Sequence, residues 1–229
     1  DIIWIGTDGQ GVYAWTKDEY TFTNILLNEL PISKKRPIRA VYTDKYNTLW
    51  LGTKDNGIIK INHYDTSKEY SNDNVIHLTT QEGLTNNEVF AFAPSNVYPE
   101  NDSIICIGMR GNGVIRLNSR TENYSFISFD RNGIAPMSDI LCIYQDQHED
   151  IWLGTSYGLT KLKISSNGNY DYKNFNENEG LPNNTIHGII EDKEGHLWLS
   201  SNTGIILFDS QKNTFRNFNH RTGLDITEF

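Results

Sequence analysis

The chain has 229 residues, of which 37% are hydrophobic and 12% aromatic, so it is long and apolar enough to bury a sizeable core. Its formal charge of −9 is spread along the sequence and argues against a nucleic-acid binder, which would present a cationic face. No run approaches the ~20 apolar residues of a membrane-spanning helix, and the N-terminus lacks the basic-then-apolar pattern of a signal peptide.

One phrase recurs along the chain at nearly constant spacing. It begins as IWIGTDGQGV at Ile3, LWLGTKDNGI at Leu49, ICIGMRGNGV at Ile105, IWLGTSYGL at Ile151 and LWLSSNTGI at Leu197. The intervals are 46, 56, 46 and 46 residues when one position is taken as equivalent in every copy: Trp4, Trp50, Cys106, Trp152 and Trp198. Polar insertions at 62–74 and 95–103 account for the longer interval. Self-similarity at this period predicts a repeat architecture.

Each copy contains four short apolar runs separated by Gly, Asn and Asp, the pattern of consecutive antiparallel strands. In the last copy the predicted strands are Ile186–Asp192, His196–Ser201, Gly204–Asp209 and Thr214–Asn219. No segment carries a 3.6-residue apolar stripe of helical length. A four-stranded antiparallel unit of about 40 to 50 residues is the blade of a β-propeller. The sequence therefore predicts an all-β propeller, a single partial domain over 1–229, with blades at approximately 1–30, 31–82, 83–132, 133–179 and 180–226.

The residues of the repeated strands fit this fold. The tryptophans recur inside strands, which indicates core positions rather than platforms for sugar stacking. A small residue follows each apolar triplet where strands would crowd toward a central axis: Gly6, Gly52, Gly108, Gly154 and Ser200. The first copy begins in its second strand, and the chain stops in GLDITEF where another blade would begin. We therefore expect a fragment of a larger, seven-bladed propeller.

A second phrase alternates with the first. It reads GLTNNE at Gly83–Glu88 and GLPNNT at Gly180–Thr185, with degenerate copies GIAPMSD at Gly133–Asp139 and GLDITE at Gly223–Glu228. Together with EDKEGHLWLSS at Glu191–Ser201, the two phrases resemble the two-component regulator propeller repeat over essentially the full length. The third copy departs from the pattern at Cys106, Met109 and GIAPMS, so we expect a local irregularity there.

This resemblance implies a function. Such repeats form the extracytoplasmic sensor of bacterial hybrid histidine kinases, many of which detect oligosaccharides released from complex polysaccharides. The resemblance thus implies a non-catalytic, periplasmic sensor domain whose ligand signal passes through a membrane-crossing segment to a cytoplasmic kinase. Its expected partners are an oligosaccharide, the remaining blades and downstream domains, and a second copy in a homodimer. No cofactor, metal, nucleic acid or direct membrane contact is expected.

Candidate ligand residues lie on the loops of one propeller face. The turns between second and third strands and the connections between blades share this face. Five cations of these loops would suit an acidic sugar: Lys34, Lys35, Arg36, Lys54 and Arg110. An ordinary solvated loop explains the same charges.

Other polar residues are candidates on the same face. Arg39 and His187 each precede a repeated Trp by eleven residues, where Leu141 stands in another copy, and they lie on the strands expected to line the channel. They are either ligand contacts or solvated channel residues. Four turn residues could stack on a sugar or hydrogen-bond to it, although turn formation alone explains the Asn and Asp: Asp55, Asn112, Tyr157 and Asn202.

The sequence gives little support for an enzymatic function. Asp44, Asp146 and Asp192 each stand six residues before a Trp, and this recurrence marks them as turn residues. The six histidines lack metal-ligand spacing, and the two cysteines are expected to be buried free thiols. The alternatives to a sensor are a protein-interaction propeller, which predicts an exposed apolar patch, and a propeller lyase or glycoside hydrolase, which predicts clustered, unrepeated acids.

Overall fold

The computed structural model describes residues 2–17, 20–25, 36–65, 75–94, 104–111, 113–121, 123–127, 138–165 and 169–224. Within these ranges the regular structure consists of β-strands and two short 3₁₀ helices, Glu177–Glu179 and His220–Thr222.

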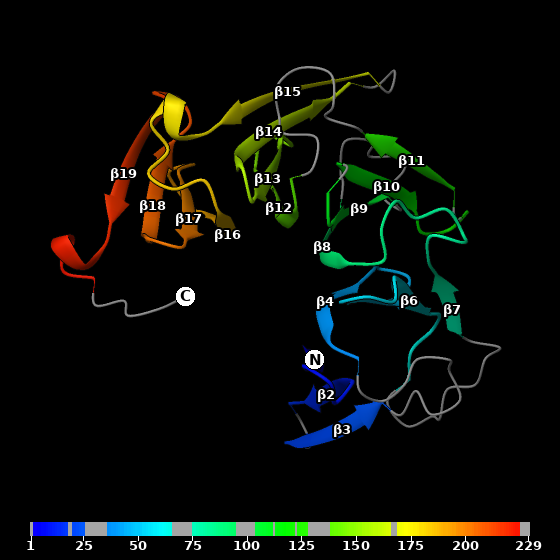
Figure 1. Ribbon diagram of the computed structural model, residues 1–229. Coiled ribbons are helices and arrows are strands. Elements are labelled where there is room, and N and C mark those ends of the chain that lie inside the picture. The colour runs from blue at the N-terminus through cyan, green and yellow to red at the C-terminus, as the bar shows by residue number, and fades with distance from the viewer. Residues whose placement is uncertain are drawn as a thin grey trace. The chain divides into compact units, whose positions relative to one another are not determined.

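The strands form five antiparallel sheets in which chain order is also spatial order (Figure 1). The first sheet holds β1 (Ile2–Gly6), β2 (Val12–Thr16) and β3 (Thr21–Ile25). The second holds β4 (Ile38–Thr43), β5 (Leu49–Thr53), β6 (Ile58–Ile61) and β7 (Val75–Leu78). The third holds β8 (Val89–Pro94), β9 (Ile104–Met109), β10 (Val114–Asn118) and β11 (Tyr124–Ile127). The fourth holds β12 (Ile140–Gln145), β13 (Ile151–Thr155), β14 (Gly158–Ile164) and β15 (Tyr170–Phe175). The fifth holds β16 (Ile186–Glu191), β17 (Leu197–Ser201), β18 (Gly204–Asp209) and β19 (Thr214–Phe218).

These sheets confirm the predicted all-β fold of consecutive antiparallel blades. The strands of the fifth sheet lie within one residue of the predicted bounds. The first sheet has three strands, and its β1 carries Trp4, the position that belongs to the second strand of the other copies. The irregularity expected in the third copy is not found at Cys106, which pairs with Arg116 in an unbroken β9–β10 register. Of the phrase GIAPMS, residues 133–137 lie outside the described residues.

The chain divides into two compact units, residues 1–92 and 93–229, with the boundary inside β8. In the first unit, apolar side chains of the first and second sheets form one core: Val12, Ala14, Ile38, Leu49, Leu51, Ile59, Ile61 and Val75. In the second unit, one core joins the third and fourth sheets: Cys106, Val114, Ile127, Ile140, Ile151, Leu153 and Leu162. Another joins the fourth and fifth: Trp152, Leu159, Phe175, Leu181, Ile186, Ile189, Leu197, Leu199, Ile206 and Phe208.

The first hairpin of a sheet is closed by an aspartate that also binds the repeated tryptophan. Asp146 Oδ1 accepts the backbone N–H groups of His148 and Asp150, both at 2.9 Å, and its Oδ2 accepts the Trp152 indole N–H at 2.7 Å. Asp44 and Asp192 make the same three bonds in the second and fifth sheets. The recurring carboxylates are therefore turn residues, as predicted, and each also accepts the indole N–H of the repeated tryptophan.

The tryptophans differ in burial. Trp50 and Trp152 are 0% and 1% exposed, which confirms their predicted core position, whereas Trp4 and Trp198 are only half-buried. The Trp4 indole nitrogen is buried and lacks a hydrogen-bond partner among the described residues.

A hydroxyl and a glycine close the turn between the second and third strands. Ser201 Oγ donates to the Gly204 carbonyl at 3.0 Å, and Thr155 Oγ1 does the same to Gly158 at 2.9 Å. Gly204 has φ +136°, and a Cβ there would lie 2.2 Å from the Phe218 carbonyl oxygen. Only glycine fits this conformation and this close approach, which recurs at Gly57 and Gly158.

In the first four sheets, the glycine after the apolar triplet packs against the residue that begins the first strand of the next sheet. A Cβ at Gly154 would lie 2.4 Å from Cys142 Sγ and 2.8 Å from the Ile186 carbonyl oxygen. Cys106 is a buried free thiol, as predicted, whereas Cys142 is free but only half-buried. Burial raises the pKa of the Cys142 thiol to about 12.

Candidate functional site

The turns between second and third strands lie beside the connections that lead into the first strand of the same sheet. In the first unit the Lys54 backbone N–H donates to the Pro37 carbonyl at 3.1 Å. In the second unit the Ser156 backbone N–H donates to the Asp139 carbonyl, also at 3.1 Å. Within each unit, the loops that carry the candidate residues therefore share one surface.

Arg36 and Asp55, two predicted site residues, form an ion pair on this surface. Arg36 Nη1 lies 2.8 Å from Asp55 Oδ1, and the two side chains are 33% and 62% exposed. Ion pairs this exposed contribute only about 0 to 1 kcal/mol to stability. Lys54 lies next to Asp55 and is exposed. The charge of Arg36 is thus offset, and this part of the surface is less cationic than the sequence suggests.

Arg39 occupies a β-bulge. The register between β4 and β5 shifts between Ile38 and Ala40, which leaves Arg39 outside the ladder. The same shift occurs at the equivalent place in β12 and β16, where the bulged residues are Leu141 and His187. Such bulges re-aim a side chain and are over-represented next to functional sites. In each of these strands, one side chain therefore does not follow the regular alternation of side chains between the two faces of the sheet.

Arg39 contacts two residues that the sequence analysis missed. Its Nη1 donates to Glu88 Oε1, and its guanidinium carbon lies 4.8 Å from the centroid of the Phe90 ring. The side chains of Arg39 and Glu88 are 28% and 15% exposed. Asn86 positions Glu88, because its Oδ1 accepts the Glu88 backbone N–H at 2.8 Å. Asn86, the first residue of the Asn-Asn pair in GLTNNE, therefore helps to position the Glu88 carboxylate beside Arg39.

Phe90 was missed because the insertion at 95–103 changes the spacing. Phe90 directly follows Val89, which packs on Gly52, just as Arg39 follows Ile38, which packs on Gly6. It is equivalent to Arg39, yet it precedes Cys106 by sixteen residues rather than eleven. The phrase NNE before Val89 was the signal that could have found it, since NNT precedes Ile186 in the same way.

In the second unit the structure brings two predicted residues together. His187 Nε2 lies 2.6 Å from Asn202 Oδ1, so the bulged histidine is tied to the turn of its own sheet. Tyr157, 39% exposed, and Arg110, also exposed, lie on the equivalent turns of the fourth and third sheets.

Three of the predicted residues, Lys34, Lys35 and Asn112, lie outside the described residues. The others fall into two groups, one in each unit. These groups are Arg36, Arg39, Lys54 and Asp55 in the first unit, and Arg110, Tyr157, His187 and Asn202 in the second.

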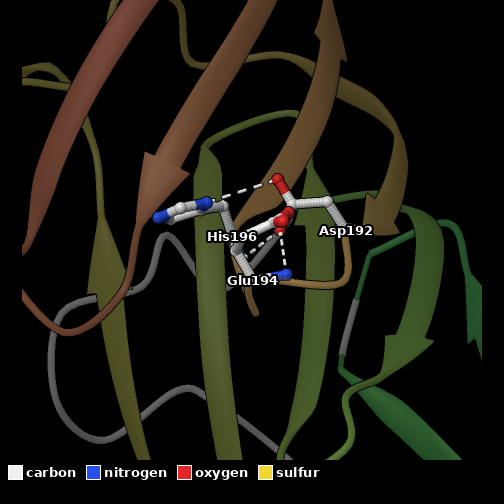
Figure 2. Close-up of side chains that lie close together, drawn as sticks. All are labelled: Asp192, Glu194 and His196. Atoms are coloured by element: carbon white, nitrogen blue, oxygen red, sulfur yellow. Dashed lines mark hydrogen bonds and ion pairs between the residues drawn. The ribbon is translucent and has the colours of Figure 1, made fainter.

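Asp192, Glu194 and His196 come together at the first hairpin of the fifth sheet (Figure 2). One ligand atom from each lies within 4.8 Å of the others, a spacing that could hold a cation. Asp192, however, already accepts two backbone N–H groups and the Trp198 indole, as its counterparts do in the second and fourth sheets. His196 Nδ1 lies 3.3 Å from Asp192 Oδ2. The cluster is thus the same hairpin turn as in the second and fourth sheets, with Glu194 and His196 beside its aspartate.

Hydrogen bonding also stabilises the charged form of the Asp192 carboxylate. Burial acts to raise the pKa of the Asp192 carboxyl, but hydrogen bonds from Trp198 and His196 outweigh it and leave that pKa below its usual value.

Known proteins support the predicted resemblance. Residues 180–203 match the family model described as "Two component regulator propeller". This segment includes the GLPNNT phrase and the LWLSS strand, two of the motifs on which the resemblance was based.

Two relatives share more of the chain. A histidine kinase, P4, of Formosa agariphila is 27% identical over 172 residues, which cover 72% of this chain and 12% of that protein. The extracellular domain of a putative hybrid two component system from B. thetaiotaomicron is 26% identical, with a TM-score of 0.78 over 100% of this chain and 28% of the solved chain. The chain therefore spans only a small part of either relative.

A more distant likeness concerns the fold alone. A virginiamycin B lyase from Staphylococcus aureus is 13% identical, with a TM-score of 0.63 over 91% of this chain and 62% of that one. The described part of this chain contains no helix with the length and apolar character to cross a membrane.

Proposed function

We propose that this chain is a non-catalytic ligand-sensing part of a hybrid two-component sensor histidine kinase, and that it lies on the extracytoplasmic side of the membrane. The likeness over the full chain to an extracellular domain of such a system supports this role. The match of residues 180–203 to the regulator propeller supports it independently of the fold.

The observation that carries the proposal is the chemistry of the bulged positions. The surrounding repeat is nearly constant in its apolar triplets, turn aspartates and glycines, because packing and turn geometry demand them. The bulged residue instead changes from Arg39 to Leu141 to His187, and the arginine and the histidine are exposed. A position that the fold leaves unconstrained, on the loop-rich surface of its own unit, is where ligand contacts can vary without loss of stability.

The ligand we propose is an oligosaccharide derived from a complex polysaccharide. Hydroxyl groups both donate and accept, and the candidate surface offers guanidinium donors, carboxylate acceptors and aromatic rings. Ligand binding would alter the packing of blades or of a dimer, and the parent chain would pass this bias to a cytoplasmic kinase. The sequence suggested acidic sugars because of the cations at Lys34, Lys35 and Arg36, but Asp55 lies 2.8 Å from Arg36 and offsets part of that charge.

Calorimetry on the complete ectodomain of the parent protein tests this function. The titrants are neutral and acidic oligosaccharides of defined length, and we expect saturable binding of at least one. A matched pair of variants places the binding: Arg39→Gln together with His187→Gln should weaken it, while Gln147→Ala, on a first-hairpin turn, should not. A folded ectodomain that binds none of the sugars would contradict direct sensing.

A further inference from the structure

We propose that Arg39, Glu88 and Phe90 form a subsite for a neutral sugar ring with adjacent hydroxyl groups, and that Glu88 excludes acidic sugars from it. This inference rests on the proposed sensing of oligosaccharides. It assigns the ligand class of one site within the first unit, and it departs from the acidic ligand suggested by the sequence.

Arg39 and Phe90 lie on two successive first strands, β4 and β8, and Glu88 directly precedes β8. Arg39 leaves the ladder of β4 at its bulge and reaches the start of β8. There it lies over the Phe90 ring at 4.8 Å and donates to Glu88. The guanidinium is therefore held from two directions, by a ring face and by a carboxylate that Asn86 positions. Groups fixed in this way lose little freedom when a ligand binds.

The hydrogen-bond donors of Arg39 and the acceptors of Glu88 together suit a ligand with two adjacent hydroxyl groups. A guanidinium has five N–H donors and no acceptor, whereas a carboxylate only accepts. Two adjacent hydroxyl groups can accept from Arg39 and donate to Glu88 at the same time, without separating the ion pair. Both charged side chains are partly exposed, at 28% and 15%, so a ligand can reach them.

Charge argues against an acidic ligand at this place. A carboxylate or sulfate that approached Arg39 would also approach Glu88, and like charges at such short range disfavour binding. The neighbouring Arg36 does not reverse this balance, since Asp55 lies 2.8 Å from it.

A purely structural role for the ion pair is a weaker explanation. The equivalent bulged positions hold Leu141 and His187, and Thr185 stands where Glu88 does in the phrase GLPNNT. The fold therefore forms in other sheets without an Arg–Glu pair. The pair adds one specific arrangement of donors and acceptors to a surface that does not need it for folding.

The test is a charge-swap experiment on the complete ectodomain. The probes are xylohexaose, mannohexaose and cellohexaose as neutral sugars and trigalacturonate as the acidic one, each titrated by calorimetry. We expect the unmodified protein to bind a neutral probe more tightly than trigalacturonate. Glu88→Gln should weaken the neutral probe by about tenfold and strengthen trigalacturonate, because charged hydrogen bonds are lost and the repulsion is removed. Arg39→Gln should weaken the neutral probe by at least as much.

The fifth sheet offers a matched control. Arg216 lies over the Phe218 ring at 4.8 Å, the same cation–π geometry as Arg39 over Phe90. Arg216→Gln should change neither affinity, and thermal melting of all variants checks that they are folded. A preference for trigalacturonate in the unmodified protein, or neutral affinity unchanged by Glu88→Gln and Arg39→Gln, overturns the subsite and leaves sensing intact. Binding of no probe at all by the folded ectodomain overturns both proposals.

Discussion

Trp152 and Trp198 hold the same position in the fourth and fifth sheets, but their surroundings differ. Trp152 is 1% exposed, with the Phe208 ring of the next sheet 5.7 Å away. Trp198 is half-buried and stacks on Phe218 of its own sheet at 5.6 Å. It lines a groove of about 360 Å³, whose rim includes Ile190 at 66% exposed.

The two tryptophans nevertheless share one bond. Each indole N–H donates to the aspartate of its own hairpin, at 2.7 Å for Trp152 and 2.9 Å for Trp198. The hydrogen bond is therefore a property of a single sheet, whereas burial requires a neighbouring sheet. This distinction predicts which substitutions the second unit tolerates.

The largest effect is expected from the two tryptophans. Trp152→Ala should lower the free energy of unfolding by about 3 to 5 kcal/mol, because it leaves a cavity between two sheets. Trp198→Ala should cost roughly 1 to 2 kcal/mol, since less apolar surface is lost from a half-buried position. Urea unfolding followed by far-UV circular dichroism measures both. Equal losses would show that burial by the next sheet is not what distinguishes them.

A smaller effect is expected at the glycine that brings two sheets into contact. Gly154→Ala should cost about 1 to 3 kcal/mol, because its Cβ would collide with Cys142 Sγ and with the Ile186 backbone. The control is Gly188→Ala, whose Cβ would meet only the Ser200 hydroxyl at 3.0 Å, a side-chain end that can rotate away. The same unfolding assay should give a clearly smaller loss for the control. A harmless Gly154→Ala would contradict the close approach.

The shared hydrogen bond predicts a dependence on pH. The pKa of Asp192 is lowered in the folded chain, so its contribution is fully present above the unfolded pKa of about 3.9 and is lost as pH falls through the lower, folded value. Asp192→Asn should therefore flatten the fall in melting temperature between about pH 5 and pH 2. Trp198→Phe, which removes one donor, should flatten it partly. An unchanged acid slope in Asp192→Asn would remove this electrostatic account.

The smallest effect is expected at the exposed rim of the groove. Ile190→Ser should change the free energy of unfolding by no more than about 0.5 kcal/mol, as surface substitutions do. Its chain neighbour Ile189 is 9% exposed and packs in the core between the fourth and fifth sheets, so Ile189→Ser should cost several times more. Similar losses from both would mean that the rim is covered in solution.

Local chemistry made the fold predictable. Strand ends such as Gly204 and turn residues such as Asp192 act within a few residues of themselves, so their spacing reveals the blade directly. Burial was less predictable, since Trp152 in IWLGT and Trp198 in LWLSS have similar local sequences and differ through a neighbouring sheet. The candidate site was predictable where partners recur at fixed spacing, as for His187. The spacing made Arg39 a candidate but not its partners: the insertion hides the equivalence of Phe90 to Arg39, and Glu88 stands where the other copy has Thr185.

The low reactivity of the two native thiols has a practical consequence. With a pKa of about 12, Cys142 stays protonated at neutral pH and is a poor nucleophile, and Cys106 is 0% exposed. A cysteine placed at the exposed Lys54 should therefore be alkylated long before either native thiol. The protein can carry a single fluorophore beside the candidate site without first removing its own cysteines, which gives an optical reporter of ligand binding.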